Sequence, residues 1–114
     1  MQIELIEIRD HLNRFAPFDN LPEQTLDDIA RQVQVGYFKA GSEILVAGEP
    51  IHELHYVRSG AVEIHRRSGE LHNRLTEGDL FGQAGLLRGN KVRLAARALE
   101  DSLIYFIPVP LVQQ

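Results

Sequence analysis

Glycines divide the chain after residue 34 into short apolar runs. They fall at positions 36, 41, 48, 60, 69, 78, 82, 85 and 89, and the runs between them are rich in Val, Ile, Leu, Tyr and Phe. Short strands with a turn signal every eight to twelve residues or so are typical of an all-β sandwich or barrel. The pattern predicts strands at 35–39, 43–46, 53–58, 61–66, 71–75, 92–98 and 103–107.

Local patterns support this prediction. Val62 and Ile64 alternate with polar neighbours, as expected for a half-buried strand. Ser59-Gly60 and Ser68-Gly69 are each predicted to form a tight hairpin turn, because glycine adopts positive φ at little cost.

The first third of the chain has a helical period instead. Its apolar residues recur at steps of three and four, in one stripe made of Leu5, Ile8, Leu12 and Phe15 and a second made of Leu26, Ile29 and Val33. Asn20 and Glu23 have the spacing of a capping box for the second helix. We therefore expect a single domain in which a helical segment (1–34) precedes a β-roll (35–108). The chain stops soon after Pro108 and Pro110 without a closing element, so we expect a module of a longer protein.

Composition excludes several classes of function. The 114 residues carry a net charge of −4, which disfavours nonspecific binding to nucleic acid or to an anionic membrane. There is no cysteine, so thiolate metal sites and disulfides are excluded and a reducing cytoplasm is the expected compartment. The most apolar stretch, 103–112, is short and interrupted by prolines, which does not suit a membrane span.

The segment from Phe81 to Leu87 carries the strongest chemical signal. It is a glycine-bounded turn followed by Arg93 on a predicted strand. Free backbone N–H groups that converge with a guanidinium form a site for a compact anion such as phosphate. Arg88, Lys91 and Arg97 add positive charge, and strand alternation predicts that Arg93, Ala95 and Arg97 share one face. The alternative interpretation of this cluster is a solvated surface strand.

The five histidines do not have the spacing of a metal site. A metal-dependent cupin, which has a jelly-roll architecture, would need two histidines one residue apart, and no such pair occurs. His52 and His55 are three residues apart, which on a strand places them on opposite faces. We therefore expect no metal and no catalysis, since no nucleophile–base pair or paired carboxylate motif stands out.

Taken in order, several segments resemble the cyclic nucleotide-binding domain family. The resemblance rests on Ala40-Gly41, Gly48-Glu49-Pro50, Tyr56–Val62, Glu77–Gly82 and Arg93-x-Ala95, and it covers the chain from about Phe15 to Pro108. It implies a mainly β double-stranded β-helix, or jelly roll, behind two short α-helices. The run 92–108 is more narrowly similar to bacterial signal-transduction proteins in which this domain precedes CBS domains and a nucleotidyltransferase-like region.

The resemblance also implies where a ligand would bind. In the family, the glycine that matches Gly82 opens a helical turn whose N–H groups face a cyclic phosphate, and the arginine that matches Arg93 pairs with that phosphate. The implied ligand-binding residues are Phe81, Gly82, Gln83, Ala84, Arg93, Leu94 and Ala95, and the implied ligand is cyclic AMP or cyclic GMP.

Two positions depart from the family pattern. Gln83 stands where the family has a glutamate that binds the ribose 2′-hydroxyl, and Leu94 stands where it has a serine or threonine that bonds the phosphate. Gln83 loses the charge that roughly doubles the strength of such a bond, and Leu94 has no hydrogen-bonding group. We therefore expect weak cyclic nucleotide binding.

Two functions are compatible with these residues. The first is a regulatory sensor that binds a cyclic nucleotide, or a similar phosphate-bearing molecule, and signals to an attached C-terminal effector. The second is a degenerate fold without a nucleotide ligand that serves protein interaction or homodimerisation. Retention of Gly82 and Arg93 favours the first, and the changes at Gln83 and Leu94 favour the second.

Overall fold

The computed structural model describes residues 3–108. Two helices come first, α1 (Ile3–Leu12) and α2 (Glu23–Gln32), with a 3-10 turn, η1 (Phe18–Asn20), between them. The strands are β1 (Gln34–Phe38), β2 (Glu43–Leu45), β3 (Glu53–Ser59), β4 (Val62–His65), β5 (Leu71–Leu75), β6 (Leu80–Phe81), β7 (Ala95–Ala98) and β8 (Ser102–Pro108), and the short helix α3 (Gln83–Leu87) lies between β6 and β7.

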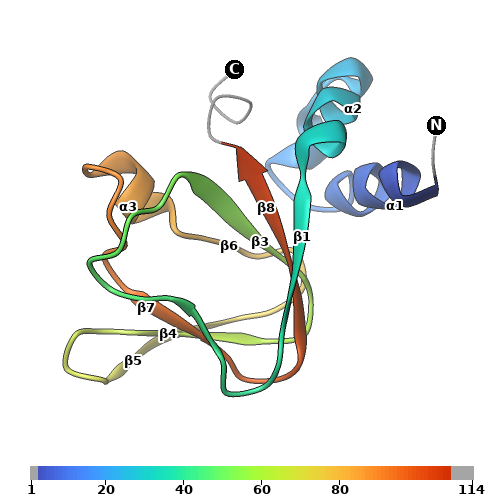
Figure 1. The fold of residues 1–114 in the computed structure, drawn as a ribbon. Helices are drawn as coiled ribbons and strands as arrows, with labels where there is room; N and C mark the ends of the chain where they lie inside the picture. The colour runs from blue at the N-terminus through green and yellow to red at the C-terminus, as the bar shows by residue number, and fades with distance from the viewer. Residues whose placement is uncertain (1–2, 109–114) are drawn as a thin grey trace.

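The strands form two antiparallel sheets that face each other (Figure 1). The first sheet has the strand order β1-β8-β3-β6 and the second has the order β2-β7-β4-β5. This arrangement confirms the predicted mainly β jelly roll behind two helices. Each predicted strand overlaps an observed one, but the two-residue strand β6 was not predicted because it is too short to show a period.

Two local predictions were wrong. Ser59-Gly60 does not close a hairpin, because β3 belongs to the first sheet and β4 to the second. Gly60, at φ 93°, instead turns the chain from one sheet to the other. The capping box of Asn20 also does not form, since Pro22 occupies the N-cap position of α2 and no side chain caps the helix. The turn at Ser68-Gly69 does join two paired strands, β4 and β5, as predicted.

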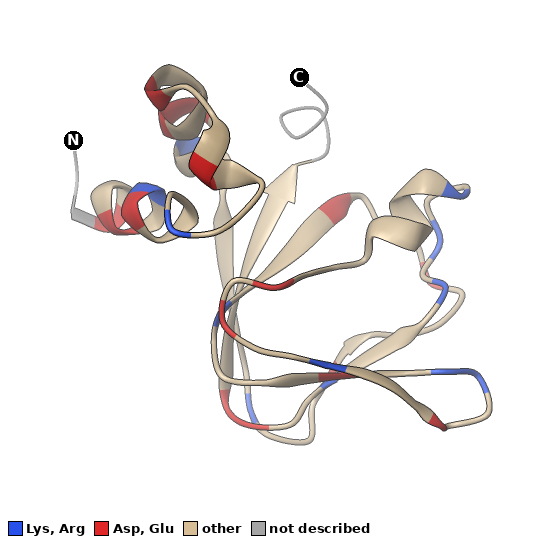
Figure 2. Ribbon diagram, turned by 180° about the vertical axis from the view of Figure 1, so that it is seen from behind, with Lys and Arg blue, Asp and Glu red and all other residues tan. Residues whose placement is uncertain are grey.

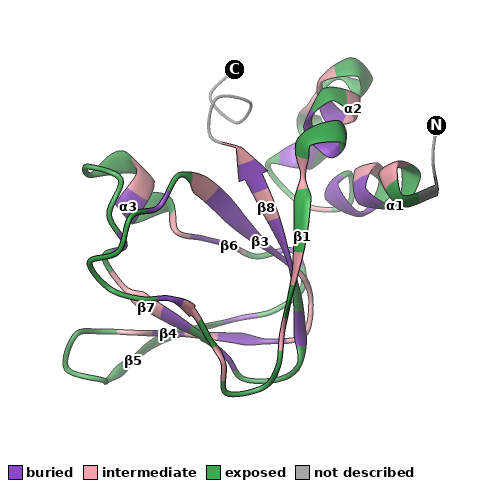
Figure 3. Cartoon of the chain, in the orientation of Figure 1, coloured by how far each residue is buried: buried purple, intermediate pink, exposed green. Residues whose placement is uncertain are grey.

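The first sheet separates two hydrophobic cores (Figure 3). The helix core lies between that sheet and the helices and contains residues of the predicted stripes, among them Ile8, Leu12, Leu26 and Ile29. The roll core lies between the two sheets and includes Val57, Val62, Phe81 and Ile104. Strand β6 contributes to both, because Leu80 packs against the helix core and Phe81 lies in the roll core.

A polar network that is buried at His11 and Tyr56 and reaches the surface at Glu77 joins the helices to the roll. The Tyr56 hydroxyl of β3 lies 2.8 Å from Nδ1 of His11, at the end of α1. Nε2 of His11 lies 2.6 Å from a carboxylate oxygen of Glu77, in the turn before β6. Because a carboxylate only accepts, Nε2 carries the proton and Nδ1 accepts from Tyr56. Burial lowers the pKa of His11, and the hydrogen bond from His11 lowers the pKa of Glu77.

Charge is distributed unevenly between the two parts of the molecule. The surplus of acidic side chains behind the net charge of −4 falls in the helical segment, since the roll has equal numbers of acidic and basic residues. In the ribbon of Figure 2, α1 and α2 carry more acidic than basic residues, and the roll carries both kinds, with several basic positions on the part distant from the helices. The molecule therefore has an acidic end and a locally basic end.

Candidate ligand-binding site

The turn between β6 and α3 depends on two glycines. Gly82 has φ 91°, a conformation that L side chains rarely adopt, and a Cβ atom there would lie 2.8 Å from Cδ1 of Ile51. Gly85 is buried in α3, and a Cβ atom there would lie 2.5 Å from the carbonyl oxygen of Lys91. The two glycines therefore hold α3 close against the segment that leads to β7. The N–H groups of residues 83–85, in the first turn of α3, have no intrahelical acceptor.

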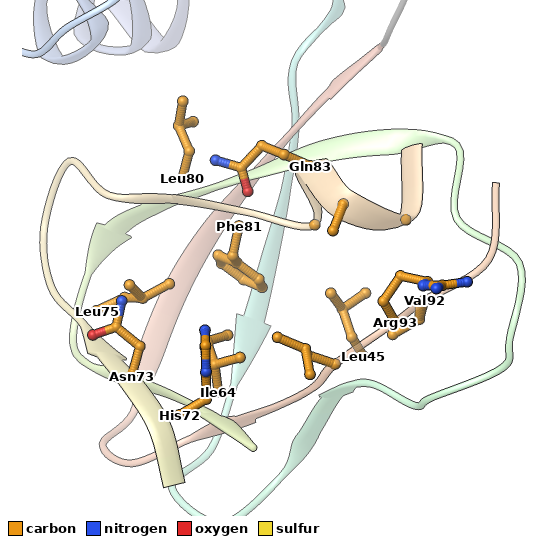
Figure 4. Close-up of a pocket in the computed structure, with 14 residues that line it drawn as sticks. Leu45, Ile64, His72, Asn73, Leu75, Leu80, Phe81, Gln83, Val92 and Arg93 are labelled. Atoms are coloured by element: carbon orange, nitrogen blue, oxygen red, sulfur yellow. The ribbon is translucent and has the colours of Figure 1, made fainter. Parts of the chain in front are cut away.

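This turn forms one wall of a cavity of about 180 Å³ (Figure 4). The cavity is lined by Leu45, Ile64, His72, Asn73, Leu75, Leu80, Phe81, Gly82, Gln83, Ala84, Gly85, Val92, Arg93 and Leu94. Six of the seven residues implied by the family resemblance are in this set, and they come from β6, α3 and the segment before β7. Most of the remaining wall is apolar, which suits a small ligand held by a few polar groups.

Ala95 is the one implied residue that does not line this cavity. Strand β7 begins at Ala95, and residues 93 and 94 lie in a bend before it. The alternation expected for Arg93, Ala95 and Arg97 therefore does not extend back to Arg93. Ala95 instead lies, with Arg97, in a groove on the outer face of the second sheet.

Arg93 lies at the rim of the cavity. Its side chain is exposed, and in Figure 4 the guanidinium extends away from Gln83 and His72. It forms no ion pair with the part of the chain that the structure describes. Arg88 and Lys91, on the loop between α3 and β7, are exposed as well. The rim is therefore positively charged without a carboxylate to neutralise Arg93.

The two departures from the family pattern both face the cavity. Gln83 is exposed and its amide points into the space between α3 and β5 (Figure 4). Leu94 is half-buried and packs against the roll core. The cavity thus has an amide where the family has a carboxylate, and an apolar side chain where the family has a hydroxyl.

Two polar residues of the cavity, His72 and Asn73 of β5, were missed by the sequence analysis. The register of β5 on β4 shifts at this point, because Ile64 pairs with Asn73 whereas His65 pairs with Leu71. His72 is therefore the extra residue of a β-bulge, and a bulge redirects side chains that would otherwise alternate. This is why two consecutive residues line the same cavity. The sequence contains no signal for the bulge, which depends on the partner strand.

His55 lies next to the Gly82 turn, on the side of the roll core. It is buried in the roll between Phe81 and Phe106, with ring centroids 5.1 Å and 5.0 Å away. Its Nδ1 donates a hydrogen bond to the carbonyl oxygen of Glu53 at 3.1 Å. Burial lowers the pKa of His55 to about 4, so the ring is neutral at physiological pH. A neutral ring can pack against the aromatic side chains without an unpaired charge in the core.

Residues 3–108 contain no group of three or more His, Cys, Asp or Glu side chains placed to hold a metal ion. No helix within that range is long and apolar enough to cross a membrane.

The comparison with known families decides the classification. Residues 35–114, which are more than half of the chain, match the family described as "Cyclic nucleotide-binding domain". The chain belongs to the cyclic nucleotide-binding domain family. No match was found among curated protein sequences.

Solved structures show the same fold. Cyclic AMP-bound PfPKA-R matches this cyclic nucleotide-binding domain with a TM-score of 0.82 at 23% identity, over 99% of this chain and 42% of that one. The sensor domain of the transcriptional regulator DNR from Pseudomonas aeruginosa matches with a TM-score of 0.82 at 22% identity, over 93% of this chain and 78% of that one. The regulatory domain of Toxoplasma gondii PKA with cyclic AMP matches with a TM-score of 0.84 at 17% identity, over 99% of this chain and 44% of that one. The domain thus spans less than half of the length of two of these three chains.

Proposed function

We propose that this domain is a non-catalytic sensor for cyclic AMP, cyclic GMP or a similar phosphate-bearing small molecule. The observation that carries the proposal is a cavity that has the Gly82 turn as one wall and Arg93 at its rim. Free N–H groups at the start of α3 and a guanidinium without a competing carboxylate are the donors that a phosphate requires. Family membership supports the same ligand class.

Binding would begin at the rim. Arg93 is exposed, and exposed side chains change rotamer within picoseconds to nanoseconds, so the guanidinium can turn toward a phosphate placed at the N–H groups of α3. The cavity volume of about 180 Å³ is below the usual range for small-molecule pockets, roughly 300–1,000 Å³. The cavity would therefore enclose the cyclic phosphate and part of the sugar, and the base would lie toward the open side.

We expect this binding to be weak. Hydrogen bonds to charged groups contribute about 1.5–3 kcal/mol each. The replacements at Gln83 and Leu94 together remove about 3–4 kcal/mol if their effects add, which corresponds to two to three orders of magnitude in affinity. A ligand that the family consensus would bind at micromolar concentration would then bind here at millimolar concentration.

Strand β6 gives the occupied site a route to the helices. A shift of the Gly82 turn toward a bound phosphate moves Phe81 in the roll core and Leu80 at the helix core together, because they are consecutive residues. We propose that the helices, and an effector attached beyond residue 114, have two alternative positions, and that this shift favours one of them. The resemblance to bacterial proteins with CBS and nucleotidyltransferase-like regions suggests the kind of effector.

A second candidate function is a protein-interaction module without a nucleotide ligand. The apolar Leu94 on the cavity wall and the outward direction of Arg93 favour this alternative.

Calorimetric titration with cyclic AMP and cyclic GMP separates the two functions. For the sensor, we expect weak heats from the wild-type protein that disappear in Arg93→Ala and persist in the matched control Arg66→Ala, which alters an exposed arginine outside the cavity. Flat traces from wild type and Arg93→Ala alike, at millimolar ligand, would favour the interaction module. Equal loss in both variants would show that binding reflects general positive charge.

A further inference from the structure

The edges of the two sheets are not equally protected against further strand pairing. Exposed edge strands present unpaired N–H and C=O groups, and proteins usually block them with short length, charged residues or bulges. Three edges of the described roll have such protection. Strand β6 has only two residues, β2 has three residues with Glu43 and a register shift, and β5 has Arg74 and the bulge at His72.

The fourth edge, β1, has none of these features. Its five residues, Gln34 to Phe38, include no charge and no proline, and they pair with β8 without a register shift. Val35 and Tyr37 project from the outer face with 53% and 57% of their surface exposed. Leu103, the partner of Tyr37 on β8, is 36% exposed and extends the apolar surface. Helices α1 and α2 cover the aromatic residues Tyr56 and Tyr105 of this face but leave these three side chains partly exposed.

We propose that β1 is a homodimer interface, at which a second copy of this chain adds its own β1 antiparallel to the first. The sequence of the strand is self-complementary about Gly36. With Gly36 opposite Gly36 of the second copy, Val35 lies opposite Tyr37 of that copy, and Gln34 lies opposite Phe38. Pairs of an aromatic with a β-branched residue are among the favourable cross-strand pairs. A two-fold axis forms the Val35–Tyr37 pair twice, and the first sheet of one copy becomes continuous with the first sheet of the other.

The rest of the molecule is compatible with this pairing. The helices lie at the Gln34 end of β1 (Figure 1), so antiparallel pairing places the two acidic helical segments at opposite ends of the joined strands. Lys39, which is exposed just after β1, would lie beside the C-terminal end of α2 of the second copy. The helix dipole favours a cation at that position.

The proposed interface is small. Stable interfaces bury roughly 1,200–2,000 Å² in total, and a five-residue strand pair with three apolar side chains on each copy is below that range. We therefore expect a weak, concentration-dependent dimer. Attachment of the domain to a larger assembly would strengthen the pairing by raising its effective concentration.

Sedimentation equilibrium over a micromolar-to-millimolar concentration series tests the proposal with two matched double variants. Val35→Lys/Tyr37→Lys places lysine opposite lysine in both copies of the pair and should shift the protein to monomer. Val35→Glu/Tyr37→Lys removes the same apolar surface but places opposite charges across the interface, and should restore at least part of the dimer. Leu71→Lys, which alters an exposed leucine on the protected edge β5, should leave the dimer unchanged.

Circular dichroism and thermal unfolding establish that each variant is folded before its mass is interpreted. The proposal stands if the association constant of the dimer falls at least tenfold in the Lys/Lys variant and recovers in the Glu/Lys variant. A monomeric wild-type protein at the highest concentration overturns the proposal. Equal loss in both double variants overturns the strand register, because it would mean that the apolar surface associates without strand pairing.

Discussion

Restoring the two family residues at the cavity should convert weak cyclic nucleotide binding into strong binding. In the double variant Gln83→Glu/Leu94→Ser, a carboxylate faces the ribose hydroxyl and a hydroxyl faces the phosphate. Leu94→Ser adds a whole bond to a charged group, which contributes about 1.5–3 kcal/mol, whereas Gln83→Glu adds only the charge that roughly doubles a bond the amide can already make. We therefore expect a total gain of about 3–4 kcal/mol, or two to three orders of magnitude in affinity, if the effects are nearly additive. Calorimetric titration with cyclic AMP and cyclic GMP measures this gain.

The two substitutions should differ in their effect on folding. Gln83 is exposed, so its change to glutamate should leave the free energy of unfolding almost unchanged. Leu94 is half-buried against the roll core, and its loss should lower the free energy of unfolding by about 1–2 kcal/mol. Urea unfolding of each single variant measures these costs. The binding gain must therefore be measured at a temperature at which the double variant is fully folded.

The control is the same double substitution combined with Arg93→Ala. If Arg93 and the α3 turn hold the phosphate, this triple variant should lose most of the gain. Unchanged affinity in the folded double variant would refute the placement of the ligand in this cavity. A gain in affinity that survives the loss of Arg93 would refute only the role of the guanidinium, and the placement of the ligand in the cavity would stand.

Three further predictions concern stability. Because the pKa of His55 is lowered from 6.5 to about 4 in the folded protein, the unfolded chain binds more protons between these pH values. The free energy of unfolding should therefore fall by about 3 kcal/mol as pH drops through that window, and this part of the fall should be absent in His55→Phe. Urea unfolding of both proteins at pH 7 and at acidic pH measures the difference. Tyr56→Phe should cost about 1–3 kcal/mol by chemical denaturation, because it leaves Nδ1 of His11 unpaired in the core; no change would mean that the bond contributes nothing. Gly82→Ala should cost about 1–3 kcal/mol, since φ is 91°, and should also weaken cyclic nucleotide binding in the calorimeter; an undiminished affinity would contradict the role of the turn.

The sequence predicted the features of the fold that depend on local chemistry. The strands follow from apolar alternation between glycines, and Gly48, Gly69 and Gly82 all have the positive φ that a turn requires. The apolar stripes of the helices likewise predicted part of the helix core, including Leu12 and Ile29. These features are local because each is set by residues within one or two turns of the chain.

The features that were missed depend on pairing between distant residues. His72 and Asn73 reach the cavity through a bulge that exists only relative to β4. Ala95 faces away from it because β7 begins at that residue, which is set by its pairing with His65. Gly60 does form a turn, but the sheet to which each flanking strand belongs cannot be read from that turn.

The uneven distribution of charge bears on how fast an anion can reach the domain. A net charge of −4 would slow the approach of a nucleotide if it were spread evenly over the surface. Here the surplus sits on the helices, and at physiological ionic strength electrostatic effects fade over about 8 Å, which is shorter than the 13.8 Å radius of gyration. A diffusing phosphate that arrives at the side of the roll where α3 lies, away from α1 and α2 (Figure 1), meets the exposed Arg88, Lys91 and Arg93 rather than the acidic helices. Added salt should therefore slow association, contrary to what the sign of the total charge implies.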